Sequence, residues 1–292
     1  MSQTSVSDLF LIMFLPEKWT SVAKFREFYG NLPRIDEELK KGTLVTEHHL
    51  NKYETLAGLA NRLAPLLKED LSELDREGYS SAQRSREYAA LIETLINELY
   101  ATLDGVRRTL YAAYRKVQGV QNSSTEKLFS RAANNEYGAG FPEEIRILLE
   151  KAFNSWFPKL RSIRTEVTHG LIGNCYLNPE TNTIGYMHQR LGTMNRAFII
   201  EDVTTELNNL AKLVSELAEE VYKTLLITIE LAEVQVTCGI YKGRFYQRIV
   251  APETSLSFNS GRCFSWEWFI YEPGFECPMR ESCGAYQRVV NS

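Results

Sequence analysis

The sequence contains few histidines and none of the short motifs that mark several large enzyme classes. Four of its 292 residues are histidine. No Walker-type phosphate loop, GxGxxG, G-x-S-x-G or H-E-x-x-H motif is present. Because each of these motifs places a particular reactive or phosphate-binding group, their absence leaves nucleotide hydrolysis, dehydrogenase chemistry and zinc proteolysis without a basis in the sequence.

Long hydrophobic runs are also missing. The run nearest the N-terminus, Leu9 to Leu15, is far shorter than the roughly 20 residues that a membrane-spanning helix needs. It follows no positive charge and precedes no small-residue cleavage site, so it does not resemble a signal peptide. We expect a cytoplasmic protein with no membrane partner, in which this run is a buried strand or the start of a helix.

Cysteine is scarce, and its placement is uneven. The five cysteines are odd in number and irregularly spaced, which argues against the disulfide framework of a small secreted protein. Four thiols could together hold a structural zinc ion, which would suit a small appendage that cannot build its own core. This metal hypothesis concerns Cys238, Cys263, Cys277 and Cys283. An iron–sulfur cluster on the same ligands and simply packed thiols are the alternatives.

Positive charge is concentrated locally, although the formal net charge is −4. Between residues 107 and 131 six cations stand against a single acid, and three more cations lie between residues 159 and 164. If the two segments pack side by side, an acidic protein gains one basic cleft of the kind that a phosphate backbone needs. The residues expected to contact RNA there are Arg107, Arg108, Arg115 and Lys116. A solvated helix face is the alternative.

The hydrophobic pattern predicts a mainly α-helical protein. From Tyr88 to Val117, apolar residues recur at steps of three and four, which is typical of a long amphipathic helix of about 30 residues. A second long helix is predicted from about Asp202 to Glu230, and a short one ends at His169. Residues 121–140, rich in Asn, Ser, Ala and Gly, predict a loop.

Three segments are expected along the chain. Residues 1–79 form an N-terminal helical segment of two or three helices, with a break around Gly42. Residues 80–233 form a helical bundle that includes a small β hairpin at 174–188. Residues 234–292, with β-branched and aromatic runs between Gly and Pro, form a small β-rich appendage that contains four of the five cysteines.

One short constellation indicates chemistry: Arg164-Thr165-Glu166-Val167-Thr168-His169-Gly170, at the predicted end of a helix. Histidine carries protons near neutral pH because its ordinary pKa is about 6.5. Arginine binds phosphate through a fixed charge and a planar fork of donors. The pair is therefore a minimal site for phosphodiester cleavage without a metal.

The spacing of the pair constrains how it can work. A step of five residues turns about 140° around a regular helix, so Arg164 and His169 do not share a face. They can converge only if the helix loosens before Gly170 or if a second subunit completes the site.

The arrangement Arg164-x4-His169, at the end of a short helix that follows a long bundle helix, resembles the Rx4–6H motif of HEPN-domain proteins. The resemblance covers residues 80–230 by the order of helices and implies a HEPN-like helical bundle. It also implies a homodimer in which the two motif residues meet across a cleft, and a metal-independent endoribonuclease of defence or stress response that needs no cofactor for catalysis. In that case His169 is the acid/base and Arg164 binds the scissile phosphate. Thr165, which stands where catalytic members commonly carry Asn, Asp or His, and Arg161 are the supporting residues.

Two alternatives follow from the same residues. Arg164 can pair with a carboxylate while His169 caps its own helix, in which case the pair is structural. The whole protein is then a non-catalytic helical module that binds a protein partner through a dimer face or through the C-terminal appendage.

Overall fold

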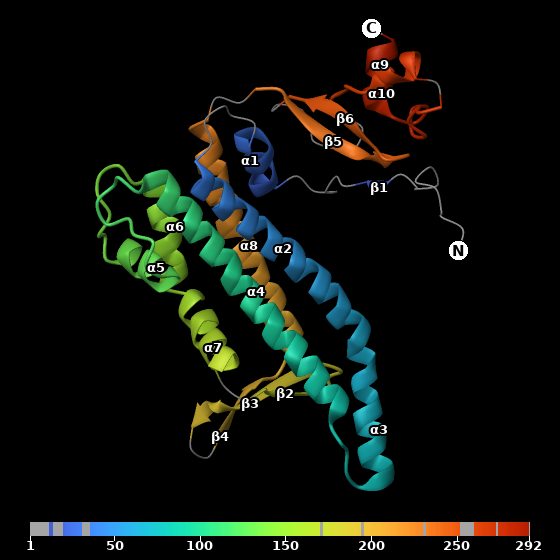
Figure 1. Ribbon diagram of the computed structural model, residues 1–292. Helices are drawn as coiled ribbons and strands as arrows, with labels where there is room; N and C mark the ends of the chain where they lie inside the picture. Colours follow the sequence, from blue (N-terminus) through green and yellow to red (C-terminus); the bar gives the residue numbers. More distant parts are fainter. Residues whose placement is uncertain are drawn as a thin grey trace. The chain divides into compact units, whose positions relative to one another are not determined.

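A computed structural model shows that the protein is mainly α-helical and carries two small antiparallel sheets (Figure 1). This agrees with the mainly α fold that the hydrophobic pattern predicts. The structure describes residues 12–13, 20–30, 36–169, 172–193, 196–229, 232–251, 260–272 and 274–291. The chain divides into two compact units, residues 36–224 and residues 1–35 together with 225–292.

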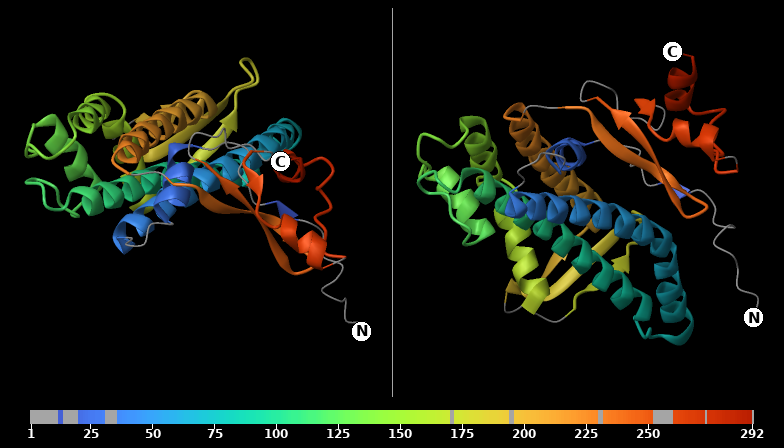
Figure 2. Two further views of the ribbon diagram at one scale, coloured as in Figure 1. Left: turned by 90° about the horizontal axis from the view of Figure 1, so that it is seen from above. Right: turned by 45° about the horizontal axis from the view of Figure 1, so that its top comes forward.

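The unit of residues 36–224 is built on three long helices that run side by side in every view (Figures 1 and 2). They are α2 (Glu37–Leu63), α4 (Gln83–Tyr114) and α8 (Val203–Ile227). The long helix predicted from the apolar steps is confirmed as α4, whose Leu95, Leu99 and Leu103 side chains are at most 1% exposed. The shorter helices are α3 (Leu67–Glu77), after a 3₁₀ turn at Ala64–Leu66, α5 (Thr125–Ala133), α6 (Glu143–Phe153) and α7 (Phe157–His169).

Helices α2 and α4 approach each other so closely that a side chain would not fit at two points. A Cβ atom on Gly42 would lie 2.5 Å from Thr109 Oγ1 and 2.7 Å from the Thr109 backbone nitrogen. A Cβ atom on Gly105 would lie 2.5 Å from Thr46 Oγ1. The helix break expected around Gly42 is therefore wrong, because α2 continues through this residue and uses it for close packing.

A buried hydroxyl network joins α8 to this crossing. The Tyr222 hydroxyl donates to Thr46 Oγ1 at 3.0 Å and shares a hydrogen bond with Thr109 Oγ1 at 2.7 Å. Burial raises the pKa of Tyr222, so the phenol keeps its proton. Because a buried polar group without a partner costs about 1–3 kcal/mol, the network favours one register of the three helices.

A buried carboxylate adds a second link between α2 and α4. Glu98 of α4 is 5% exposed, and its two oxygens lie 2.6 Å from His49 Nδ1 and 2.6 Å from Lys52 Nζ. Burial acts to raise the pKa of Glu98, but the hydrogen bonds with His49 and Lys52 outweigh it and the pKa is lowered. The carboxylate is therefore ionised near neutral pH and holds two side chains of α2.

The loop expected over residues 121–140 is wrong in its centre, which forms α5. Ser124 caps this helix, since its Oγ accepts a hydrogen bond from the Lys127 backbone nitrogen at 3.2 Å. Phe129 is fully buried and stacks on Phe157, with 4.0 Å between ring centroids. The Ser124 cap and the burial of Phe129 thus stabilise a helix in a segment whose polar composition predicted a loop.

A three-stranded antiparallel sheet packs against α4 in the same unit. Its strands are β2 (Asn174–Leu177), β3 (Ile184–Thr193) and β4 (Arg196–Ile200). Strands β2 and β3 pair across the turn at residues 178–183, within the hairpin expected at 174–188, and β3 extends beyond it to pair with β4. The sheet follows α7 in the chain.

The second unit combines the N-terminal helix with the C-terminal part of the chain. Helix α1 (Ser21–Gly30) packs on a four-stranded antiparallel sheet in the order β1-β5-β6-β7. Its elements are β1 (Ile12–Met13), β5 (Val234–Tyr241), β6 (Arg244–Val250), β7 (Arg262–Cys263), α9 (Trp266–Tyr271) and α10 (Gly284–Val290). Helix α1 therefore groups with the C-terminal strands, and α2 and α3 group with the bundle.

The N-terminal apolar run contributes to this second unit. Ile12 and Met13 form β1, which pairs with β5, while the rest of the run from Leu9 to Leu15 lies outside the described residues. None of the helices that the structure describes is long and apolar enough to cross a membrane.

We predict that Gly42→Ala destabilises the helical unit, because the added Cβ would meet the backbone of Thr109 and force α2 away from α4. The expected loss in the free energy of unfolding is about 2 kcal/mol. Urea unfolding followed by circular dichroism measures this loss.

Gly58→Ala is the matched control, because Gly58 also lies within α2 but the atom nearest to an added Cβ is Arg62 Nη1 at 3.8 Å. Alanine there should stabilise the helix by about 0.5–1 kcal/mol, since it restricts the unfolded chain. Equal effects of the two substitutions would contradict the close approach of the helices.

Candidate active site and candidate metal centre

The candidate active site lies on α7, which packs along α4. Pro158 lies in the first turn of α7, where the missing N–H costs nothing. Phe157, Leu160 and Ile163 are at most 3% exposed and form the buried face of the helix. Arg164 follows directly and is half-buried at the edge of this face.

A stripe of polar residues on α4 positions the C-terminal part of α7 and the chain that leaves it. Asn97 Oδ1 accepts a hydrogen bond from Thr168 Oγ1 at 3.1 Å. One turn earlier, the buried Glu93 Oε1 accepts a hydrogen bond from the Gly173 backbone nitrogen at 2.6 Å. Glu93, Asn97 and Tyr100 are spaced by four and three residues, so they share one face of α4.

Arg164 is held by the third member of this stripe. Its Cζ lies 4.8 Å from the centroid of the Tyr100 ring, an arrangement that favours a cation over an aromatic face. Burial and Asp104 raise the pKa of Tyr100, while Arg164 opposes the shift, so the phenol is neutral. Among the described residues, no carboxylate lies within ion-pair distance of Arg164. The guanidinium is thus positioned without being neutralised.

His169 is the last residue of α7, and the helix is regular up to that point. The loosening that would turn Arg164 and His169 toward each other within one chain does not occur, and the two positions remain about 140° apart around the helix. Gly170, expected to end the helix, lies outside the described residues. The two positions therefore do not share a face of α7.

The two expected supporting residues have local partners. Arg161 is exposed, and its Nη2 lies 2.7 Å from Glu126 Oε2 on α5. The Thr165 hydroxyl donates to the Arg161 carbonyl oxygen at 2.9 Å, one turn back along α7. Arg161 therefore joins α7 to α5, and Thr165 is exposed on the surface next to Arg164 in sequence.

Acidic residues outside the basic run, one on the same helix and one distant in sequence, reduce the positive charge of the expected basic cleft. Helices α4 and α7 do lie side by side. Two of the four cations expected to contact RNA are paired, Arg107 with Asp104 at 3.6 Å and Arg115 with Asp36 at 3.2 Å. The other two, Arg108 and Lys116, are exposed, and the described residues place no carboxylate within ion-pair distance of either.

Sequence patterns do not single out Asn97 or Tyr100, although a signal is present. Together with Glu93 they interrupt one edge of the apolar stripe of α4 at helical spacing. Such an interruption indicates a face that meets polar groups. The groups that this face of α4 meets are set by the packing of α7, and the sequence pattern of α4 alone does not reveal that packing.

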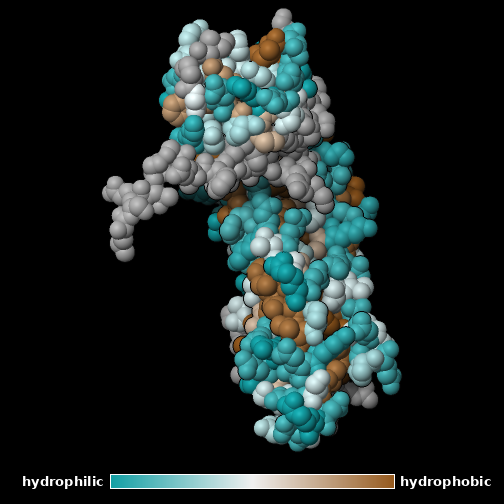
Figure 3. Space-filling model, turned by 90° about the vertical axis from the view of Figure 1, so that its right-hand side faces the viewer, coloured by the Kyte–Doolittle hydropathy of each residue, from teal (hydrophilic) through white to brown (hydrophobic). Residues whose placement is uncertain are grey.

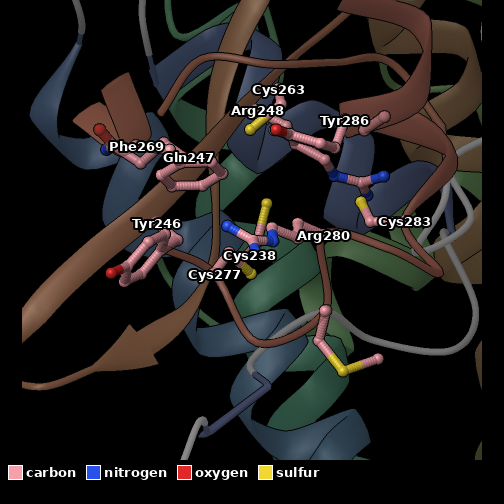
Figure 4. Close-up of a pocket in the computed structure, with 12 residues that line it drawn as sticks. Cys238, Tyr246, Gln247, Arg248, Cys263, Phe269, Cys277, Arg280, Cys283 and Tyr286 are labelled. Carbon is pink, nitrogen blue, oxygen red and sulfur yellow. The ribbon is translucent and has the colours of Figure 1, made fainter. Parts of the chain in front are cut away.

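The four C-terminal cysteines, which come from separate segments, line one small cavity (Figure 4). Cys238 lies in β5, Cys263 in β7, Cys277 between α9 and α10, and Cys283 immediately before α10. The cavity has a volume of about 30 Å³, and all four thiols are free. The residues named as metal ligands from the sequence are thus brought to one place.

The four thiols line this cavity but are not arranged as a set of metal ligands. Burial raises the pKa of Cys238 and of Cys263 to about 12, and at Cys238 the nearby Arg248 opposes the shift. Within the described ranges, no three His, Cys, Asp or Glu side chains are grouped so that they could hold a metal ion as they stand. The sulfurs would have to turn inward to act as a ligand set.

The helical unit thus holds one charged guanidinium on an aromatic ring, five positions before the last residue of the same helix, His169. The C-terminal unit presents four soft sulfur atoms around a small cavity. Comparison with known proteins adds no family to these observations, because no family model, no curated protein and no solved structure matches this chain.

Proposed function

We propose that this protein is a HEPN-like, metal-independent endoribonuclease that acts as a homodimer in defence or stress response. Arg164 of one subunit binds the scissile phosphate of single-stranded RNA, and His169 of the other subunit transfers protons. Arg108 and Lys116 contact neighbouring phosphates. Arg161 and Thr165 support the surface around Arg164.

The observation that carries the proposal is the environment of Arg164. Arg161 and Arg115 are each paired with a carboxylate. Arg164 instead rests on the Tyr100 ring at 4.8 Å. A stacked guanidinium keeps its charge and its in-plane donors, which suits the recognition of a phosphate.

The chemistry needs only the groups that the proposal names. The 2′-hydroxyl must lose a proton, the leaving 5′-oxygen must gain one, and the charge on the phosphate must be offset. Attack of the 2′-oxygen on the adjacent phosphorus breaks the bond to the 5′-oxygen and leaves a 2′,3′-cyclic phosphate and a 5′-hydroxyl. Histidine suits the proton transfers near neutral pH, and arginine suits the phosphate.

Two features support a homodimer. The regular α7 keeps Arg164 and His169 on different faces, so a joint site requires residues from two chains. Hydrophobic residues also lie together on one face of the helical unit (Figure 3). Separately, Leu44 and Leu74 of this unit are 43% and 46% exposed. Apolar surface of this kind favours association.

A non-catalytic interaction module is the second candidate, and one observation favours it. Arg107, Arg115 and Arg161 are held in ion pairs, so positive and negative charge are closely balanced near α4 and α7. Such a surface attracts nucleic acid less strongly than a field of unpaired cations. It would suit a protein partner or a second copy of the chain.

His169→Ala should abolish the cleavage of single-stranded RNA by the purified protein in excess EDTA, because the proton carrier is lost. Gel electrophoresis of end-labelled RNAs of varied sequence measures cleavage, and the products should carry a 2′,3′-cyclic phosphate. Thermal unfolding of the variant should match that of the wild type.

The matched control is His48→Ala, which removes an exposed imidazole from α2 and should leave cleavage at the wild-type rate. If wild type and both variants are equally inert across all RNAs, catalysis is excluded and the interaction module is favoured.

Tyr100→Leu should weaken RNA binding about fivefold, or roughly 1 kcal/mol, because Arg164 loses the ring that positions it. Tyr100→Phe should bind like the wild type, since it keeps the ring face and removes only the hydroxyl. Fluorescence anisotropy on the non-cleaving His169→Ala background measures both affinities. Equal affinities for the Leu and Phe variants would show that the ring does not position the guanidinium.

A further inference from the structure

We propose that Cys238, Cys263, Cys277 and Cys283 bind a single zinc ion, which ties the C-terminal sheet to the helices that follow it. The site is separate from the proposed RNA cleavage and does not depend on it. Its ligands come from β5, β7, the segment between α9 and α10, and the residue before α10.

The first argument is convergence. The four cysteines are separated in sequence by 25, 14 and 6 positions, yet all of them line the same cavity (Figure 4). The remaining cysteine, Cys175, lies in β2 of the other unit. Every cysteine of the C-terminal unit is thus directed to one place, although none of them forms a disulfide there.

Four thiolates hold two kinds of metal centre, and a small cavity favours the smaller one. Four sulfurs in a tetrahedron bind a single zinc ion at about 2.3 Å, and the same ligands hold iron–sulfur clusters. The cavity measures about 30 Å³. We therefore assign the smaller centre, a single zinc ion, to it.

A buried positive charge next to the sulfurs fits a negatively charged centre. Arg248 of β6 is 0% exposed and lines the cavity. Its Nη1 donates to the Ser260 carbonyl oxygen at 2.7 Å and to Ser260 Oγ at 3.1 Å, both of which are neutral acceptors. Four thiolates and one Zn²⁺ carry a net charge of −2 (four times −1, plus 2), which Arg248 would partly offset from a neighbouring position.

The role of the ion is structural. All four coordination positions would be filled by protein, so none remains for water or a substrate. Among the described residues of this unit, one buried apolar cluster comprises Phe28, Val234, Val236 and Val250. Small units often gain stability from a metal that links distant segments, and this one would link two strands to α10.

Binding of the ion requires the four sulfurs to come closer together around one point of the cavity. The sulfurs line the cavity but do not yet enclose an ion. A single torsion, χ1, sets the position of each sulfur among three staggered wells. Closure is therefore a change of side-chain rotamers around an existing space.

The test is the metal content of the full-length protein, purified under reducing conditions and measured by inductively coupled plasma mass spectrometry. About one zinc per chain is expected. Cobalt(II) exchanged into the site should show thiolate-to-cobalt charge transfer and tetrahedral d–d absorption. Cys238→Ser and Cys277→Ser should each reduce the metal content to near zero.

Cys175→Ser is the matched control and should retain the zinc, because that residue lies in the other unit. Thiol alkylation of the wild type keeps the test independent of how the variants fold: four cysteines should resist alkylation until a chelator removes the metal. Metal-free protein whose thiols alkylate equally with and without chelator, disulfides among the four, or iron with acid-labile sulfide would each overturn the proposal.

Discussion

The helical unit depends on the distance between α2 and α4, which only glycine at residues 42 and 105 permits. At this distance Thr46 and Thr109 both reach the Tyr222 hydroxyl, and α8 is drawn into the same contact. Larger side chains at the two glycines would separate the helices and weaken the hydrogen bonds that Tyr222 makes with Thr46 and Thr109. The crossing therefore determines which face of α4 meets α2 and α8, and which face is left for α7.

That remaining face carries Glu93, Asn97 and Tyr100, and it explains why Arg164 lies where it does. Asn97 accepts a hydrogen bond from Thr168 near the end of α7, and Glu93 accepts one from the backbone of Gly173 just after it. The Tyr100 ring supports the Arg164 guanidinium. A carboxylate in place of the ring would have neutralised Arg164. A ring holds the charge in position and leaves it available, which is the physical basis for proposing that this surface binds phosphate.

Local periodicity was enough to predict α4 and the extent of α8, because their apolar stripes are contained in the sequence of each helix. Several of the features that failed depend on neighbours that are distant in sequence. Gly42 resembles a helix break until Thr109 is placed against it, and Asp36, which pairs with Arg115, lies far outside the basic run that suggested a cleft. The four C-terminal cysteines could be named from composition alone, but their shared cavity follows from the pairing of β5, β6 and β7.

The central claim, that Arg164 and His169 act together from two copies of the chain, is tested most directly with mixed dimers. Arg164→Ala and His169→Ala chains are co-expressed with different tags, and the heterodimer is isolated through both. In a two-fold symmetric dimer one intact pair remains, so the heterodimer should recover about half of the wild-type cleavage while both parent homodimers are inactive. A heterodimer as inactive as its parents would contradict the account, because the two residues would then not meet across subunits.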